Sequence, residues 1–187
     1  MPRQIVITQN ITLDGVVEAL DWFTPEGDGD VSDLMPTLVE AMDREVAFLA
    51  GRRTFEEMRG YWPAQTDDTT GITAHLDAVE KLVVSSTLTD PAWANSTVLR
   101  GGAGLADDVA GLLKEGPDGD IGVTGSIELC HALLAADLVD ELRLYTYPVV
   151  LGRGRRLFPD GVGLRPRLVD SRAFRSGVSL QTYRLHG

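Results

Sequence analysis

Residues 51–54 of the chain, Gly-Arg-Arg-Thr, have the composition of an anion-binding turn. The apolar run at 46–50 predicts a buried strand, and the sequence from Thr54 to Met58 predicts the first turn of a helix. Glycine lets the backbone turn and approach a ligand, a helix start presents free N–H groups, and two arginines add permanent positive charge. This combination suits a phosphate group. An ordinary strand-to-helix turn with two solvated arginines explains the same residues equally well.

Two other predicted strands also end in small polar residues. Gly125 and Ser126 follow an expected strand at 120–124 and precede an expected helix at 127–136, and a strand at 81–86 ends in Ser85 and Ser86. The glycine fingerprint of Rossmann dinucleotide sites, the P-loop and the G-x-S-x-G elbow of hydrolases are all missing from the sequence. These absences argue against three common classes of enzyme.

The cysteine and histidine residues predict neither a disulfide nor a metal site. Cys130 is the only cysteine, and its place in a helical pattern predicts a buried structural thiol. The three histidines, at 75, 131 and 186, have no metal-ligand spacing.

Length and composition indicate one ordinary globular domain over residues 1–187. Hydrophobic content of 43% and charged content of 24% predict a folded chain, and no apolar run approaches the roughly 20 residues of a membrane helix. The N-terminus lacks the pattern of a secretory signal, so we expect a cytoplasmic protein that does not contact membranes. A net charge of −11 argues against nucleic acid as a partner.

The order of the expected elements predicts an α/β fold. Strands and helices alternate through most of the chain, and two final strands are joined by a turn at 175–177. This order predicts a mostly parallel sheet covered by helices, with a C-terminal antiparallel hairpin. The strands are expected at 3–9, 45–50, 81–86, 97–100, 120–124, 140–150, 167–174 and 178–185, and the main helices at 33–44, 54–60, 105–114 and 127–136.

Several of these segments together resemble the dihydrofolate reductase superfamily. Residues 51–56 and 82–86 are similar to its cofactor segment and the following strand, and residues 124–126 to its second nucleotide-binding turn. Residues 12–15, 139–144 and 147–158 resemble the riboflavin-biosynthesis reductase branch, the C-terminal domain of deaminase-reductases. The resemblance spans nearly the whole chain. It implies a three-layer α/β/α fold, NADPH as hydride donor and a homodimer.

The resemblance also implies which residues contact the cofactor. Arg52 and Ser86 would hold the adenosine 2′-phosphate, with Arg53 and Ser85 nearby. Arg100 would lie near the adenosine, although a solvated charge at a strand end explains it equally well. The donors to the pyrophosphate would come from two helix starts, namely Thr54 at one and Gly125, Ser126 and Ile127 at the other, and Gly51 would let the backbone approach the cofactor.

The implied substrate pocket lies opposite the nicotinamide. Trp22 and Tyr145 would line it, and Asp14 would belong to a mobile loop that covers it. Asp33 resembles by its place the acid that assists protonation in dihydrofolate reductases, and we take it as the candidate catalytic residue. An ordinary helix-start carboxylate explains Asp33 as well, and Trp22 is also compatible with a simple anchor to the core.

We therefore expect an NADPH-dependent oxidoreductase that transfers hydride to a pteridine- or pyrimidine-like heterocycle, in the manner of the ribosylaminouracil reductases of riboflavin biosynthesis. One alternative is a true dihydrofolate reductase, which would depend on Asp33. Another is a nucleotide-binding protein that has the scaffold without turnover.

Overall fold

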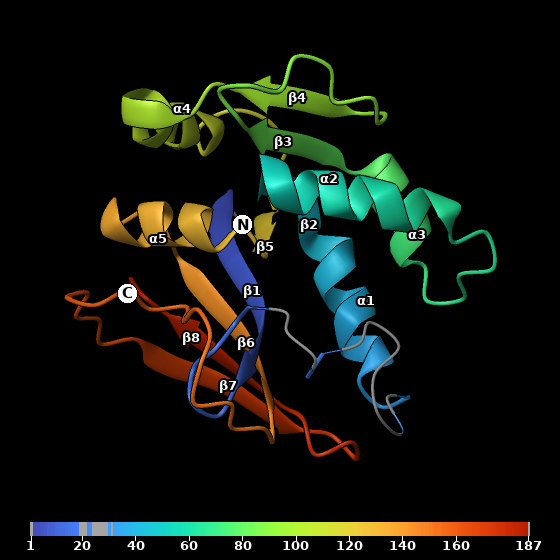
Figure 1. The fold of residues 1–187 in the computed structure, drawn as a ribbon, viewed down its shortest axis with the longest axis vertical. Coiled ribbons are helices and arrows are strands. Elements are labelled where there is room, and N and C mark those ends of the chain that lie inside the picture. The colour runs from blue at the N-terminus through green and yellow to red at the C-terminus, as the bar shows by residue number, and fades with distance from the viewer. Residues whose placement is uncertain (1, 19–21, 24–29, 31, 187) are drawn as a thin grey trace.

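The computed structural model describes residues 2–18, 22–23, 30 and 32–186. Its centre is an eight-stranded sheet in the order β4-β3-β2-β5-β1-β6-β8-β7 (Figure 1). The first six strands in this order are parallel, whereas β8 runs antiparallel to both β6 and β7. The strands are β1 (Gln4–Thr12), β2 (Glu45–Gly51), β3 (Glu80–Val84), β4 (Ser96–Leu99), β5 (Asp120–Thr124), β6 (Glu141–Tyr147), β7 (Arg167–Ala173) and β8 (Ser179–Arg184).

Helices cover both faces of the sheet, which gives the expected three layers. Val109 and Leu133, from α4 and α5, pack in one buried cluster with Ile7 of β1. On the other face, Phe55 of α2 packs against Phe48 of β2. The helices are α1 (Met35–Arg44), α2 (Arg52–Tyr61), α3 (Ile72–Ala78), α4 (Leu105–Leu112) and α5 (Ile127–Ala135), with short 3₁₀ turns at Trp62–Ala64 and Gly102–Gly104.

The burial of each strand follows from its place in the sheet. β1 lies between β5 and β6, and its apolar residues Ile5, Val6 and Ile7 are buried although they point to alternate faces. β7 lies at the edge, and all seven of its residues are exposed. The fold class, including the C-terminal hairpin, is the one that the sequence predicts.

Element boundaries differ from expectation at three places that matter for the site. Helix α1 begins at Met35, two residues later than expected, so Asp33 precedes the helix. Helix α2 begins at Arg52, two residues earlier than expected, so both arginines belong to its first turn. Strand β6 ends at Tyr147 and not at residue 150, because Pro148 has no N–H to donate to a neighbouring strand.

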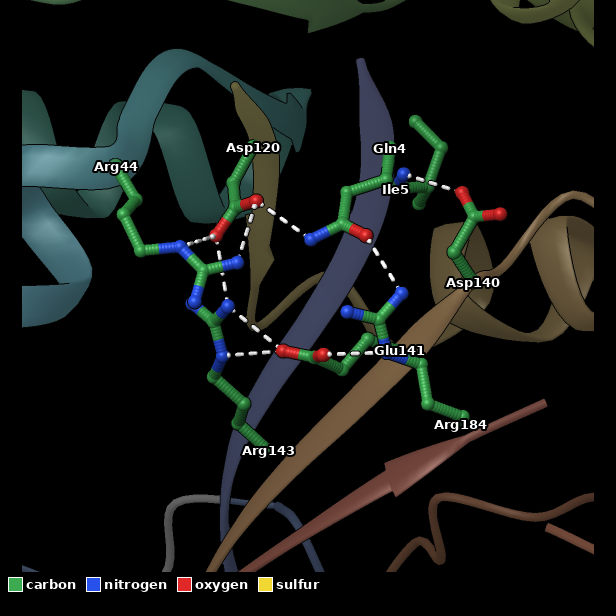
Figure 2. A network of polar contacts seen from close by, with 8 residues as sticks. All are labelled: Gln4, Ile5, Arg44, Asp120, Asp140, Glu141, Arg143 and Arg184. Atoms are coloured by element: carbon green, nitrogen blue, oxygen red, sulfur yellow. Dashed lines mark hydrogen bonds and ion pairs between the residues drawn. The ribbon is translucent and has the colours of Figure 1, made fainter. Parts of the chain in front are cut away.

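A network of charged and polar side chains links neighbouring strands at the end of the sheet where the parallel strands begin (Figure 2). Asp120 at the start of β5 accepts from Gln4 of β1 at 2.7 Å and from Arg143 of β6 at 2.7 Å. Arg143 also bonds Glu141 at 2.7 Å, and Glu141 pairs with Arg184 of β8 at 3.0 Å. Burial opposes the charge of Arg143, but Glu141 and Asp120 together raise the pKa of its guanidinium. The network therefore joins four strands at the amino ends of the parallel strands, away from the carboxyl ends where the candidate site lies.

Candidate active site

Two helices begin side by side at the carboxyl ends of neighbouring parallel strands, where α/β proteins bind ligands. β2 ends at Gly51 and leads into α2, and β5 leads through Ser126 into α5. The backbone N–H of Gly51 donates to Ser126 Oγ at 2.7 Å. In return the backbone N–H of Ser126 donates to Thr54 Oγ1 at 2.9 Å. These reciprocal hydrogen bonds hold the two helix starts together.

The close approach of these turns requires glycine at Gly125. Its φ of +68° lies in the left-handed region, and a Cβ there would come within 2.9 Å of Thr54 Cγ2. Ser126 is also left-handed, with φ 55° and ψ 60°. A non-glycine residue in this region costs of the order of 1–3 kcal/mol, and such strain gathers at functional sites. The strained turn is therefore held in shape by its neighbours.

Two side chains secure the same turn from within the core. Gln9 of β1 donates through Nε2 to the carbonyl of Gly125 at 3.2 Å, and Cys130 donates through Sγ to that carbonyl at 3.3 Å. The Gly125 carbonyl and the Ser126 N–H belong to one peptide group, so this group is held at both ends. Burial raises the pKa of the Cys130 thiol to about 12, which agrees with a structural thiol and not a nucleophile.

The N–H groups of Gly51 and Ser126 are already used in these bonds, so the backbone donors that a ligand could reach are those of the first turns of α2 and α5. The N–H of Cys130 bonds the Ser126 carbonyl at 3.0 Å, so the helical hydrogen bonds of α5 begin there and the N–H groups of residues 127–129 precede them. Ile127 is among these three. Helix α2 begins next to it, so the positive ends of two helix dipoles lie together. This combination favours a ligand with two adjacent anionic groups.

Arg52 and Arg53 flank the helix starts as exposed cations. Arg52 pairs with Glu56 at 2.7 Å and Arg53 with Glu57 at 3.0 Å, both within one turn of α2. Exposed pairs of this kind contribute only about 0.3–0.5 kcal/mol. Either guanidinium can therefore exchange its carboxylate for a phosphate at little cost.

The loops after β3 and β4 hold the remaining predicted cofactor residues. Ser85 is buried, and its Oγ accepts from the N–H groups of Thr87 at 3.2 Å and Leu88 at 2.9 Å. Ser86 is exposed beside it. Arg100 lies near this turn because its Nη1 donates to the Leu88 carbonyl at 3.5 Å. Ser85 thus shapes the loop that presents Ser86, and the cofactor contacts of all three residues stay predictions.

An aromatic cluster lies at the carboxyl end of β6. Trp22 packs against Tyr147 with ring centroids 5.3 Å apart, and Phe23 packs edge-on against Tyr147 at 5.9 Å. Each of these three side chains is half-buried. The sequence singled out Trp22 but not the contact with Tyr147, because only the fold brings the loop after β1 to the end of β6.

Asp33 and Tyr145 lie near the turn between β7 and β8. Asp33 Oδ2 accepts from the backbone N–H of Arg175 at 2.9 Å, while Asp33 Oδ1 is buried without a hydrogen-bond partner among the described residues. Tyr145 is 3% exposed and stacks on Phe174 at 6.5 Å, and burial raises the pKa of its phenol to about 12. Tyr145 therefore packs in the core beneath α1, whereas Asp33 has one buried oxygen without a partner among the described residues.

Asp14 joins two loops at the carboxyl edge of the sheet. Its carboxylate accepts from Thr12 Oγ1 at 2.7 Å and from the N–H groups of Leu151 at 3.2 Å and Gly152 at 2.8 Å. These hydrogen bonds, that from Thr12 first, lower its pKa to about 2. The loop after β1 is thus tied to the loop after β6, and a substrate contact for Asp14 stays a prediction.

The described part of the chain was searched for metal-binding clusters and for membrane-spanning helices. No group of three or more histidine, cysteine, aspartate or glutamate side chains there could hold a metal ion. Among the same residues, no helix has both the length and the apolar character needed to cross a membrane.

Comparison with models of protein families identifies the family of this chain. The family model of the RibD C-terminal domain matches residues 3–180. The chain belongs to the RibD C-terminal domain family. This family is of the reductase type, which suggests a nicotinamide cofactor.

Individual relatives agree with this membership in the RibD C-terminal domain family. The uncharacterized protein YyaP of Bacillus subtilis strain 168 is 28% identical over 196 aligned positions, which cover 99% of this chain and 96% of YyaP. Two solved structures have the same fold over the whole chain. One, named for riboflavin biosynthesis, comes from Shewanella sp. PV-4, with a TM-score of 0.71, 21% identity and all of that chain covered. The other is a pyrimidine reductase-like protein of Corynebacterium diphtheriae, with a TM-score of 0.65, 15% identity and 92% of that chain covered.

Proposed function

We propose that this protein is an NADPH-dependent reductase of a pteridine- or pyrimidine-like heterocycle. The proposal rests on the two reciprocal hydrogen bonds that link Gly51, Ser126 and Thr54. They hold two helix starts together as one site that suits a pyrophosphate. The reductase-type family supports this assignment.

The chemistry of the donors fits NADPH. The free N–H groups of both helix starts would bind the pyrophosphate, and Thr54 and Ser126 hold those starts in place. Arg52 is exposed at the outer side of the same turn and would pair with the 2′-phosphate, helped by Ser86 and Arg53. The bound nicotinamide supplies the hydride, and the protein supplies binding and orientation.

The aromatic cluster supports a planar substrate. Trp22, Phe23 and Tyr147 offer apolar ring surface at the carboxyl end of β6, where a flat heterocycle could stack. Asp33 would hold the proton for the reduced ring at Oδ1, the oxygen without a partner among the described residues. The names of the two similar solved structures, which refer to riboflavin biosynthesis and pyrimidine reduction, agree with this class of substrate.

A titration of NADPH and NADH against the wild type and Arg52→Ala tests the cofactor assignment. We expect tighter binding of NADPH by the wild type, and a loss of roughly tenfold to a hundredfold for NADPH alone in the variant, because a charge-assisted contact is worth about 1.5–3 kcal/mol. Arg165→Ala, which removes an exposed arginine outside the site, is the matched control. Equal affinities of the wild type for the two nucleotides would contradict the assignment.

Asp33 favours one specific alternative, a true dihydrofolate reductase, because its Oδ1, which has no partner among the described residues, could carry the proton that a pterin receives. In that case Asp33→Asn should sharply lower turnover of dihydrofolate. A panel of flavin, pterin and ribityl-pyrimidine substrates, followed by NADPH oxidation, compares the substrate classes directly. Nucleotide binding without oxidation across the whole panel would favour a binding protein on the same scaffold.

A further inference from the structure

The loop after β6 carries three exposed arginines, Arg153, Arg155 and Arg156, in a protein whose net charge is −11. None of them belongs to the two helix starts of the candidate active site. The side chain of Arg155 nevertheless forms an ion pair with Glu128, a residue of the first turn of α5. One cation of this loop therefore lies beside a helix start of the site.

The backbone of Arg155 is fixed on both sides. Its N–H donates to Glu18 Oε2 at 3.2 Å, and its carbonyl accepts from the N–H of Val17 at 3.0 Å. The next carbonyl, that of Arg156, accepts from Nε2 of His131 in α5 at 3.0 Å. The loop after β6 is thus held against both the loop after β1 and α5, which limits where the Arg155 guanidinium can reach.

Glu128 lies among the backbone donors of α5. The N–H groups of residues 127–129 precede the helical hydrogen bonds, and the Glu128 side chain is 83% exposed at the same turn. A carboxylate there competes with an anionic ligand for the positive end of the helix dipole. Arg155 neutralises this carboxylate. Because the Arg155 side chain is itself 44% exposed, the ion pair contributes little to stability and can be exchanged for another anion.

We propose that Arg155 is a further cofactor-binding residue, which leaves Glu128 and pairs with the diphosphate of a bound nicotinamide nucleotide. This inference rests on the proposed function, because it needs the diphosphate to lie at the start of α5. A guanidinium suits that position, since its planar fork donates two parallel hydrogen bonds to phosphate oxygens. The reductase-type family suggests a nicotinamide cofactor and so supports the same ligand independently of the geometry.

This contact differs from that of Arg52 in the nucleotides that it affects. NADPH and NADH share the diphosphate, whereas only NADPH has the 2′-phosphate. Arg155→Ala should therefore weaken the binding of both by a similar factor, roughly tenfold to a hundredfold for a charge-assisted contact, and leave the preference between them unchanged.

Arg153→Ala is the matched control, because it removes the same charge two residues away on the same loop. Exposed charges that do not touch the ligand are screened by salt, so this variant should change either affinity by no more than about twofold. Equal losses in Arg153→Ala and Arg155→Ala would contradict a specific contact of Arg155.

The two ends of the ion pair should give opposite results. Glu128→Gln frees Arg155 and removes a competing charge, so both affinities should rise by about twofold, the value of one exposed ion pair. If Arg155 only held the loop against α5, breaking the pair from either end would weaken binding. A loss of affinity in Glu128→Gln would therefore rule out the direct contact.

Isothermal titration of ADP and AMP isolates the diphosphate. The two ligands differ by one phosphate, and neither has a nicotinamide or a 2′-phosphate. The wild type should bind ADP more tightly than AMP, and Arg155→Ala should lose most of this difference, whereas Arg52→Ala and Arg153→Ala should keep it. The same ratio of ADP to AMP affinity in Arg155→Ala and the wild type would overturn the role of Arg155.

Failure of the proposed function gives a different pattern. A wild type that binds neither NADPH nor NADH would overturn the reductase assignment, and this inference with it. A wild type that binds these nucleotides, together with an Arg155→Ala variant that binds them equally well, would overturn the role of Arg155 alone.

Discussion

The hydrogen bond from the Ser126 N–H to Thr54 Oγ1 offers a direct test of the linked helix starts. Thr54→Val keeps the shape of the side chain but removes the acceptor, so the Ser126 N–H loses its partner at 2.9 Å. Ser126 is partly buried, and water can replace the threonine only in part. A donor left unpaired in this way costs about 1–2 kcal/mol.

This cost should appear in both stability and binding. In a chain of 187 residues, 1 kcal/mol changes the melting temperature by about 2–4 °C, so Thr54→Val should melt about 2–8 °C below the wild type. Urea unfolding should give the same loss of free energy. Because the bond orients the start of α5, NADPH affinity should also fall. If Thr54 only stabilised the fold, the folded variant would bind NADPH as tightly as the wild type.

Thr54→Ser is the matched control because it keeps Oγ1 and removes only the methyl group. It should remain within about 0.5–1 kcal/mol of the wild type, the cost of one methyl group. Ser126→Ala removes the reciprocal bond to the Gly51 N–H, and the double variant with Thr54→Val should lose less than the sum of the two single losses. Equal stability of Thr54→Val and Thr54→Ser, or strict additivity in the cycle, would refute the view that the two bonds act as one unit.

Two further perturbations probe other parts of the structure. Asp14 has a folded-state pKa of about 2 against an ordinary value of 3.8, so it adds stability above about pH 4 that is lost as the pH falls toward 2. Asp14→Asn should therefore lower stability at neutral pH and flatten the acid limb of a urea-denaturation series measured between pH 2 and 5. Gly122→Ala would drive a Cβ into Glu45 Oε1, and we expect a loss of about 1–3 kcal/mol in thermal unfolding. In a Glu45→Ala background the added loss should be much smaller, and an undiminished loss would point to a cause other than this contact.

The sequence predicted the class of fold because its signals are local. Alternation of strands and helices, glycines at several of the turns and a separate hairpin at the end of the chain sufficed for a mostly parallel sheet with an antiparallel addition. Boundaries were less accurate where a single residue decides them, as Pro148 does at the end of β6.

The candidate site was only partly visible in the sequence. Each helix start could be recognised from its own glycine, but the link between Thr54 and Ser126 joins residues 72 positions apart. A buried hydrogen bond could have been predicted for Gln9, because it is a polar residue in an apolar strand. The partner of that bond, the Gly125 carbonyl, could not have been predicted. It lies 116 positions away, and only the pairing of β1 with β5 brings it close to Gln9.

By itself the sequence determined the kinds of residue available: helix starts with glycine, exposed arginines, and a loop with aromatic side chains. Only the tertiary structure decided which of them meet. It set two helix starts against each other, placed Trp22 on Tyr147, drew Asp14 into a contact between loops and left one oxygen of Asp33 without a partner among the described residues. The physical reason is that such contacts depend on strand order and register, which hydrophobic burial fixes over the whole chain and no single segment encodes.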